Sequence, residues 1–185
     1  MRKIQGRFPP KKKAAIVIKK KQNGRMKDME LKALYREILN EHNINPVHKK
    51  DGGDGNLSLQ GVNPSCGDNI TLTLRTENGK ISDGSFSGSG CAISQASCDM
   101  MLDLIIGKDE DEAMRLCEIF MGMIQGTATE EQIEELDEAG SLREIQHMPA
   151  RVKCAELGWR TMREMLGLKK TEASSSLPHA GCPTE

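Results

Sequence analysis

Three short segments place a cysteine in a turn or at the start of an expected helix. They are Cys-Gly-Asp at 66–68, Gly-Ser-Gly-Cys at 88–91 and Ala-Arg-Val-Lys-Cys at 150–154. Together they offer three thiols and one carboxylate, from Cys66, Cys91, Cys154 and Asp68. Three sulfurs and one oxygen can complete the tetrahedral coordination of a zinc ion. If these side chains converge, the chain can hold a metal through thiolates that also do sulfur chemistry.

The local sequence around each of these cysteines favours the thiolate, the form that binds metal and attacks sulfur. Cys66 lies in a turn that Gly67 allows to bend sharply. Cys91 follows Gly-Ser-Gly at an expected strand-to-helix junction, where free N–H groups and the helix dipole lower a thiol pKa. Cys154 is expected in the first turn of the last helix, with the positive charges of Arg151 and Lys153 beside it.

The other three cysteines are expected to be structural or incidental. Cys117 lies beside the apolar stripe of its helix, and Cys182 lies in the tail. Cys98 follows Cys91 by seven residues, about 10 Å along a helix axis, which is too far for both to bind one ion. The chain has no Cys-x-x-Cys pair, so spacing alone leaves a zinc site and ordinary buried thiols both open.

Composition indicates one acidic domain behind a basic leader. Residues 1–25 contain ten Lys or Arg and no acid, which leaves sixteen basic against twenty-seven acidic residues in the rest of the 185-residue chain. An acidic body favours basic protein partners over nucleic acid. The apolar run at 14–18 is shorter than the roughly 7–15 residues of a signal-peptide core, and no apolar stretch approaches the roughly 20 residues of a membrane span. Six cysteines without a secretory signal indicate the cytoplasm.

Apolar periodicity predicts an α+β fold: a small three-stranded antiparallel sheet covered on one side by several helices. A helix is expected over 28–42, and later helices over 92–107, over 110–125 and from Pro149 onward. Strands are expected over 57–62, 70–75 and 81–87, the last two joined by a hairpin turn at Asn78-Gly79. The acidic stretch 126–142 is expected to be a partly exposed insert. We assign 1–27 to a disordered leader, 28–168 to the domain and 169–185 to a disordered tail.

From about Lys32 to Leu166 the chain resembles the iron–sulfur scaffold family that includes IscU and the NifU N-terminal domain, and specifically its SufU-type branch. The matching segments are Asn-Pro-Ser-Cys-Gly-Asp at 63–68, Gly-Ser-Gly-Cys-Ala-Ile-Ser at 88–94 and Pro-Ala-Arg-Val-Lys-Cys at 149–154. Lys153 stands where the scaffold branch has a histidine, and the Leu-Pro-Pro-Val-Lys segment of that branch is absent. The insert is also typical of SufU-type proteins.

The resemblance implies a zinc ion held by Cys66, Asp68, Cys91 and Cys154. It also implies a partner, a pyridoxal-phosphate-dependent cysteine desulfurase of the SufS type, whose histidine replaces a cysteine on the zinc. Cys66 would then accept the persulfide sulfur and pass it to downstream iron–sulfur assembly proteins. Arg151 resembles a family arginine near the site that could steer the persulfide or hold the aspartate. The implied activity is zinc-dependent sulfur transfer.

Two other functions fit the same residues. One is a scaffold on which iron and a transient [2Fe–2S] cluster are assembled, against which Lys153 argues. The other is a structural zinc domain that binds partners through its acidic surface. Structural zinc sites use cysteine and histidine ligands, so the carboxylate of Asp68 argues against this third function.

Overall fold

The computed structural model describes residues 28–175, and both 1–27 and 176–185 lie outside the described part. The predicted leader and the end of the predicted tail therefore lie outside the described residues. The sheet contains β1 (Leu57–Asn63), β2 (Asp68–Glu77) and β3 (Lys80–Ser89). The helices are α2 (Asp28–Ile44), α3 (Ala92–Ile105), α4 (Glu110–Gln125), α5 (Glu130–Glu135), the 3₁₀ segment η1 (Asp137–His147) and α6 (Pro149–Ser175).

The three strands are antiparallel in the order β1-β2-β3. Asn78 and Gly79 both adopt positive φ, 52° and 76°, as a type I′ hairpin turn requires. Along β2 the buried positions alternate with more exposed ones and begin at Asp68. Because side chains alternate between the two faces of a strand, Asp68 shares the core face with Ile70 and Leu72.

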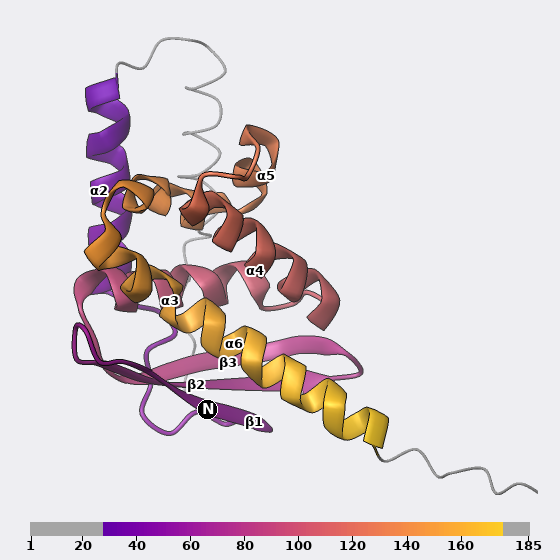
Figure 1. Ribbon diagram of the computed structural model, residues 1–185. Coiled ribbons are helices and arrows are strands. Elements are labelled where there is room, and N and C mark those ends of the chain that lie inside the picture. The colour runs from indigo at the N-terminus through magenta and orange to yellow at the C-terminus, as the bar shows by residue number, and fades with distance from the viewer. Residues whose placement is uncertain (1–27, 176–185) are drawn as a thin grey trace, which may run out of the picture.

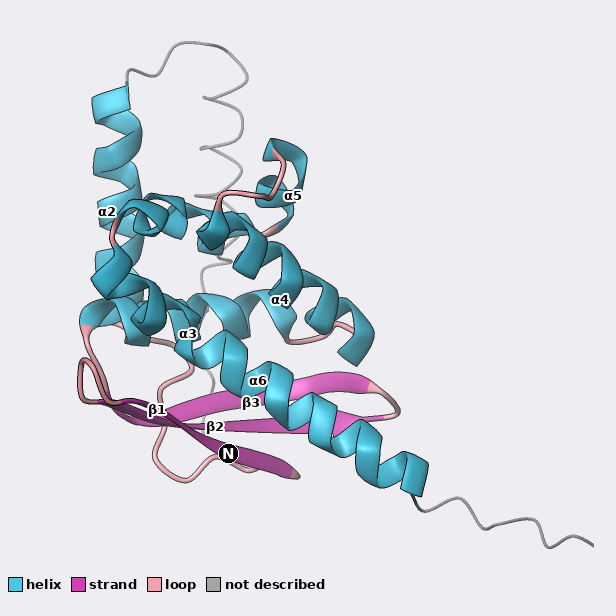
Figure 2. Ribbon diagram, in the orientation of Figure 1, coloured by secondary structure: helices cyan, strands magenta, loops and turns pink. Residues whose placement is uncertain are grey.

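All described helices lie on one side of the sheet, as the sequence predicts (Figures 1 and 2). Helices α3 and α6 form the layer that contacts the strands, and α4 packs behind them. Phe120 of α4 stacks on Trp159 of α6, with ring centroids 4.3 Å apart and planes 10° from parallel. This stacked pair fixes the two helices against each other. The three-stranded antiparallel sheet with helices on one side confirms the predicted α+β fold class.

The acidic insert is only half exposed. Helix α5 buries no residue, although Thr129 and Gln132 form a reciprocal capping box at its start. The following η1 segment, in contrast, contributes to the core. It and the residue before it bury four apolar side chains at intervals of three: Leu136, Ala139, Leu142 and Ile145. The expectation of a partly exposed insert therefore describes α5 and not η1.

The last helix continues through Ser175, beyond residue 168 where the sequence analysis ends the domain. Lys169 accounts for part of this extension, because its ammonium group donates to the Thr76 hydroxyl at 2.9 Å and pairs with Glu110. These contacts tie the helix end to β2 and α4. Among the described residues, no helix is long and apolar enough to cross a membrane.

Candidate metal centre

A tight turn between β1 and β2 carries Cys66. The backbone N–H groups of Cys66 and Gly67 donate to the carbonyl oxygen of Asn63, at 3.2 and 3.0 Å. Gly67 adopts a φ of +71°, a conformation that glycine reaches without strain. The turn leaves Cys66 exposed at the edge of the sheet.

Asp68, the first residue of β2, is fully buried and held at both carboxylate oxygens. Oδ1 accepts the backbone N–H of Cys91 at 2.7 Å, and Oδ2 accepts the side-chain amide of Asn63 at 3.1 Å. A buried carboxylate needs such partners, because desolvation without compensating hydrogen bonds is costly. Asp68 is thus fixed in place between β1 and the start of α3.

Cys91 is the N-cap of α3, at the junction that the sequence predicts. Its Sγ accepts the backbone N–H of Ser94 at 3.5 Å. Near the end of β3, Gly88 has a φ of +102°, and a Cβ at this position would come within 2.2 Å of the Asn69 carbonyl oxygen of the paired strand β2. This close approach of the two strands precedes the start of α3, whose Cys91 N–H reaches Asp68 at the beginning of β2.

Cys154 is fully buried, and it lies in the second turn of α6 rather than in the first. Burial, together with the neighbouring Cys66, Asp68 and Cys91, raises the pKa of the Cys154 thiol well above its ordinary value. The expectation that the sequence around all three cysteines favours a thiolate is therefore wrong for Cys154 in the metal-free protein. Cys154 lies five positions after Pro149, the first residue of the helix, and burial is the main cause of the raised pKa.

Three of the four predicted ligands form one tight group. The ligand atoms of Cys66, Asp68 and Cys154 all lie within 4.8 Å of one another, and the two sulfurs of Cys66 and Cys154 are 3.1 Å apart. Cys91 lies beside this group: its backbone binds Asp68, and its thiol is near enough to affect the pKa of Cys154. Ligands on one tetrahedral zinc ion lie about 3.3–3.8 Å apart, so the group has the size and donor set for that ion.

Asn63 is a site residue to which the sequence analysis assigns no role. Its amide nitrogen donates to Asp68 and also lies 3.3 Å from the Cys154 sulfur. Its side-chain oxygen accepts the N–H of Ser65 at 3.3 Å, a local Asx-type turn. An asparagine that opens a tight turn ahead of a cysteine is the signal that could have revealed it.

The two basic residues near Cys154 lie at the surface. Arg151 and Lys153 are exposed on α6. Asn63 and the Cys91 N–H hold the Asp68 carboxylate, and neither of these two contacts involves Arg151.

Cys98 and Cys117 lie in the core, as expected of structural thiols. Burial raises the pKa of each to about 12. The Cys117 thiol donates to the Trp159 carbonyl oxygen at 3.5 Å, and a Cβ on Gly158 would come within 2.5 Å of the Cys98 sulfur. Cys182 lies outside the described residues.

Known proteins resemble this chain in both sequence and fold. Residues 34–155 match the family described as "NifU-like N terminal domain". A Streptococcus pyogenes protein named "Iron-sulfur cluster assembly scaffold protein IscU" is 40% identical over 137 residues, covering 74% of this chain and 85% of that protein. The Bacillus subtilis "Zinc-dependent sulfurtransferase SufU" is 36% identical over 145 residues, covering 78% of this chain and 96% of that protein. The crystal structure of a putative SUF-system scaffold from Fervidobacterium islandicum superposes with a TM-score of 0.65 at 31% identity. The superposition covers 70% of this chain and 94% of that one.

The chain belongs to the IscU/NifU family of iron–sulfur cluster assembly proteins. Within that family it is a SufU-type member, as the B. subtilis relative and the Fervidobacterium structure indicate.

Proposed function

We propose that the protein is a zinc-dependent sulfurtransferase that accepts persulfide sulfur from a SufS-type cysteine desulfurase for iron–sulfur cluster assembly. The observation that carries the proposal is a difference in exposure within the site. Cys66 is exposed, whereas Asp68 and Cys154 are fully buried. Cys91 is half-buried. Cys66 is therefore the most accessible of the three thiols to a partner's persulfide. The name of the B. subtilis relative supports the same activity.

A zinc ion held by Cys66, Asp68, Cys91 and Cys154 would keep the thiols deprotonated at neutral pH without oxidising them. The residues of the protein then have separate roles. Asn63 and the Cys91 N–H hold Asp68 in position. The buried thiol of Cys154 would stay on the zinc ion when Cys66 dissociates from it. Arg151, exposed on the same helix as Cys154, offers positive charge to the incoming persulfide.

The transfer step is a thiol–persulfide exchange with no net oxidation. The Cys66 thiolate attacks the terminal sulfur of the donor persulfide, and a new S–S bond forms on Cys66. The S–S bond of the donor breaks, and the donor cysteine leaves as a thiolate. Cys66 then carries a persulfide for a downstream iron–sulfur assembly protein.

A scaffold function, in which iron and a [2Fe–2S] cluster are assembled on the same four residues, is the second candidate. It is favoured by the relatives named as scaffolds, including those from S. pyogenes and Thermotoga maritima, at 40% and 37% identity. The two functions share ligands and differ in what the site holds after reaction: a persulfide on Cys66, or a coloured cluster.

The test is the turnover of a SufS-type desulfurase on cysteine with and without the zinc-loaded protein. We expect acceleration by the wild-type protein and by the matched Cys182→Ala variant, and none by Cys66→Ala. Circular dichroism shows whether Cys66→Ala remains folded. If the wild-type protein does not accelerate the desulfurase, the sulfur-transfer proposal is wrong. A stable visible chromophore after anaerobic addition of iron and sulfide would then support the scaffold function.

A further inference from the structure

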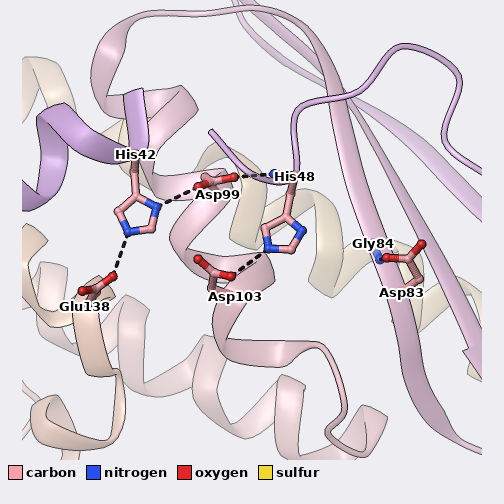
Figure 3. A network of polar contacts seen from close by, with 7 residues as sticks. All are labelled: His42, His48, Asp83, Gly84, Asp99, Asp103 and Glu138. Atoms are coloured by element: carbon pink, nitrogen blue, oxygen red, sulfur yellow. Dashed lines mark hydrogen bonds and ion pairs between the residues drawn. The ribbon is translucent and has the colours of Figure 1, made fainter. Parts of the chain in front are cut away.

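A second cluster of metal-binding side chain types lies further along α3 (Figure 3). It is formed by His42 at the end of α2, His48 in the following loop, Asp99 and Asp103 of α3, and Glu138 of η1. Asp99 lies eight residues beyond Cys91, about 12 Å along the helix axis. The cluster is therefore separate from the cysteine site.

The centre of this second cluster is compact and buried. His42, Asp99 and Asp103 each offer a ligand atom, and these atoms lie within 4.8 Å of one another. Asp99 is fully buried, and His42 is 7% exposed. Asp99 and Asp103 are four residues apart, so they lie one turn apart on the same face of α3. His42 Nδ1 faces Asp99 Oδ2 at 2.7 Å.

Two further residues orient these three. Glu138 Oε2 lies 2.9 Å from His42 Nε2, on the side of the ring away from Asp99. His48 Nε2 lies 2.9 Å from Asp103 Oδ1, and the His48 backbone N–H donates to Asp99 Oδ1 at 2.8 Å. Metal-bound histidines commonly donate their second ring N–H to a carboxylate, which turns the other nitrogen toward the ion. The Glu138–His42 pair has this arrangement.

Charge and access also suit a cation. Three carboxylates share this largely buried space with two imidazoles, and a divalent ion that replaces the proton on His42 Nδ1 would offset the like charges of the acids. A cavity of about 270 Å³ lies beside the cluster, and its lining includes Asp103, Glu138 and Lys108. The cavity gives an ion and its water ligands a route from solvent, which a metal site needs.

We propose that His42 Nδ1, Asp99 and Asp103 form a second metal site, for a divalent first-row transition ion that prefers nitrogen and oxygen ligands. One imidazole and two carboxylates favour Mn²⁺, Fe²⁺ or Zn²⁺ over ions that need soft sulfur ligands. Water from the cavity fills the remaining positions, and Glu138 and His48 act as positioning residues. The ion joins α2 to α3 directly and to η1 through Glu138. The proposal is independent of sulfur transfer at Cys66.

The test uses Mn²⁺ with the full chain already loaded with one equivalent of zinc. Zinc occupies the thiolate site, for which Mn²⁺ competes poorly. Electron paramagnetic resonance then measures free Mn²⁺ during the titration. We expect one Mn²⁺ to bind per chain and the thermal midpoint of unfolding to rise with Mn²⁺ concentration.

Two substitutions test whether the ion binds at this cluster. Asp103→Asn keeps the shape of the side chain and removes its charge, and we expect it to weaken Mn²⁺ binding by at least about tenfold. His48→Gln removes an orienting group and should weaken binding less. Asp83→Asn is the matched control, because Asp83 is exposed on β3 and binds only the neighbouring Gly84 N–H among the contacts drawn in Figure 3.

Zinc content at the cysteine site and circular dichroism report whether each variant is folded. Failure of the zinc-loaded wild-type protein to bind Mn²⁺ would overturn the proposal without any variant. Equal Mn²⁺ affinity in wild type and in folded Asp103→Asn, or in folded His48→Gln if Asp103→Asn does not fold, would also overturn it.

Discussion

The side-chain amide of Asn63 donates to Asp68 Oδ2 at 3.1 Å and lies 3.3 Å from the Cys154 sulfur. One residue at the end of β1 thus contacts two candidate ligands that come from β2 and α6. Because an amide nitrogen carries two hydrogens, it can serve both acceptors. Asn63 therefore holds the Asp68 carboxylate and the buried Cys154 thiol in position relative to each other before any metal binds.

Asn63→Ala is expected to weaken zinc binding by about 10–100-fold, the range for loss of a group that orients a metal ligand. Competition with a chromogenic zinc chelator measures the dissociation constant. Gln60→Ala is the control, since Gln60 is an exposed amide on the same strand whose side chain donates to Asn69. Equal zinc affinity in Asn63→Ala and Gln60→Ala would show that Asn63 does not support the site.

Gly88→Ala is expected to destabilise the fold by more than about 1 kcal/mol, because its φ of +102° is strained for alanine and the new Cβ would meet the Asn69 carbonyl oxygen at 2.2 Å. Gly167→Ala is the matched substitution in α6, where nothing lies within 4 Å of the new Cβ. It should stabilise the protein by about 0.5–1 kcal/mol. Urea denaturation measures both. A Gly88→Ala variant as stable as wild type would contradict the close approach of β3 to β2 at Gly88.

The stability of the protein is expected to fall as pH rises through the range in which His42 titrates. Burial opposes the charged ring, but hydrogen bonds to Asp99 and Glu138, and the charges of these acids, outweigh burial and raise the pKa of His42 from 6.5 to about 9. A raised folded-state pKa contributes stability that is fully present below pH 6.5 and is lost as pH rises through about 9.

This contribution is at most about 3.5 kcal/mol, from roughly 1.4 kcal/mol per unit of pKa. The measurement is urea denaturation from pH 6 to 10 without added metal, for wild type and His42→Gln. The thiols also titrate in this range, so the informative quantity is the difference between the two proteins. That difference should shrink as pH rises. A difference that is independent of pH would show that His42 is not charged in the folded protein.

Cys98 and Cys117 are expected to resist alkylation in the folded protein, because burial holds the pKa of each at about 12 and the thiolate is the reactive form. Among the five cysteines of the described residues, iodoacetamide at pH 8 should modify Cys66 first in the metal-free protein. Peptide mass spectrometry assigns each modified cysteine, and labelling in denaturant is the control. Rapid labelling of Cys117 under native conditions would contradict its place in the core.

Features set by neighbouring residues could be predicted from the sequence. Asn78-Gly79 specifies its own hairpin turn through the positive φ of both residues. The apolar residues of α3 and α4 repeat at helical spacing, so the expected ranges match the observed helices closely. The burial of Asp68 also follows the alternation of β2, which the sequence analysis used only for the apolar residues.

Features that depend on distant parts of the chain could not be predicted in this way. Leu136, Ala139, Leu142 and Ile145 are buried at intervals of three, the period of a 3₁₀ helix, so a search for the 3.6-residue α-helical period passes over them. His42 and Asp99 are 57 residues apart, and Asn63 and Cys154 are 91 apart. No local pattern marks these pairs. The turn or helix start around each cysteine is local and marks the three segments as candidates, but their meeting at one site follows from the family resemblance, and the burial of Cys154 depends on tertiary packing.

The central claim is that Cys66 is the sulfur acceptor of a zinc site shared with Asp68, Cys91 and Cys154. Its most direct test is peptide mass spectrometry of the zinc-loaded protein after a brief reaction with a SufS-type desulfurase and cysteine, with persulfides trapped by alkylation. We predict that the added sulfur atom is found on the peptide containing Cys66. Added sulfur on Cys91 or Cys154 with Cys66 unmodified, or no added sulfur on any cysteine, would contradict the claim.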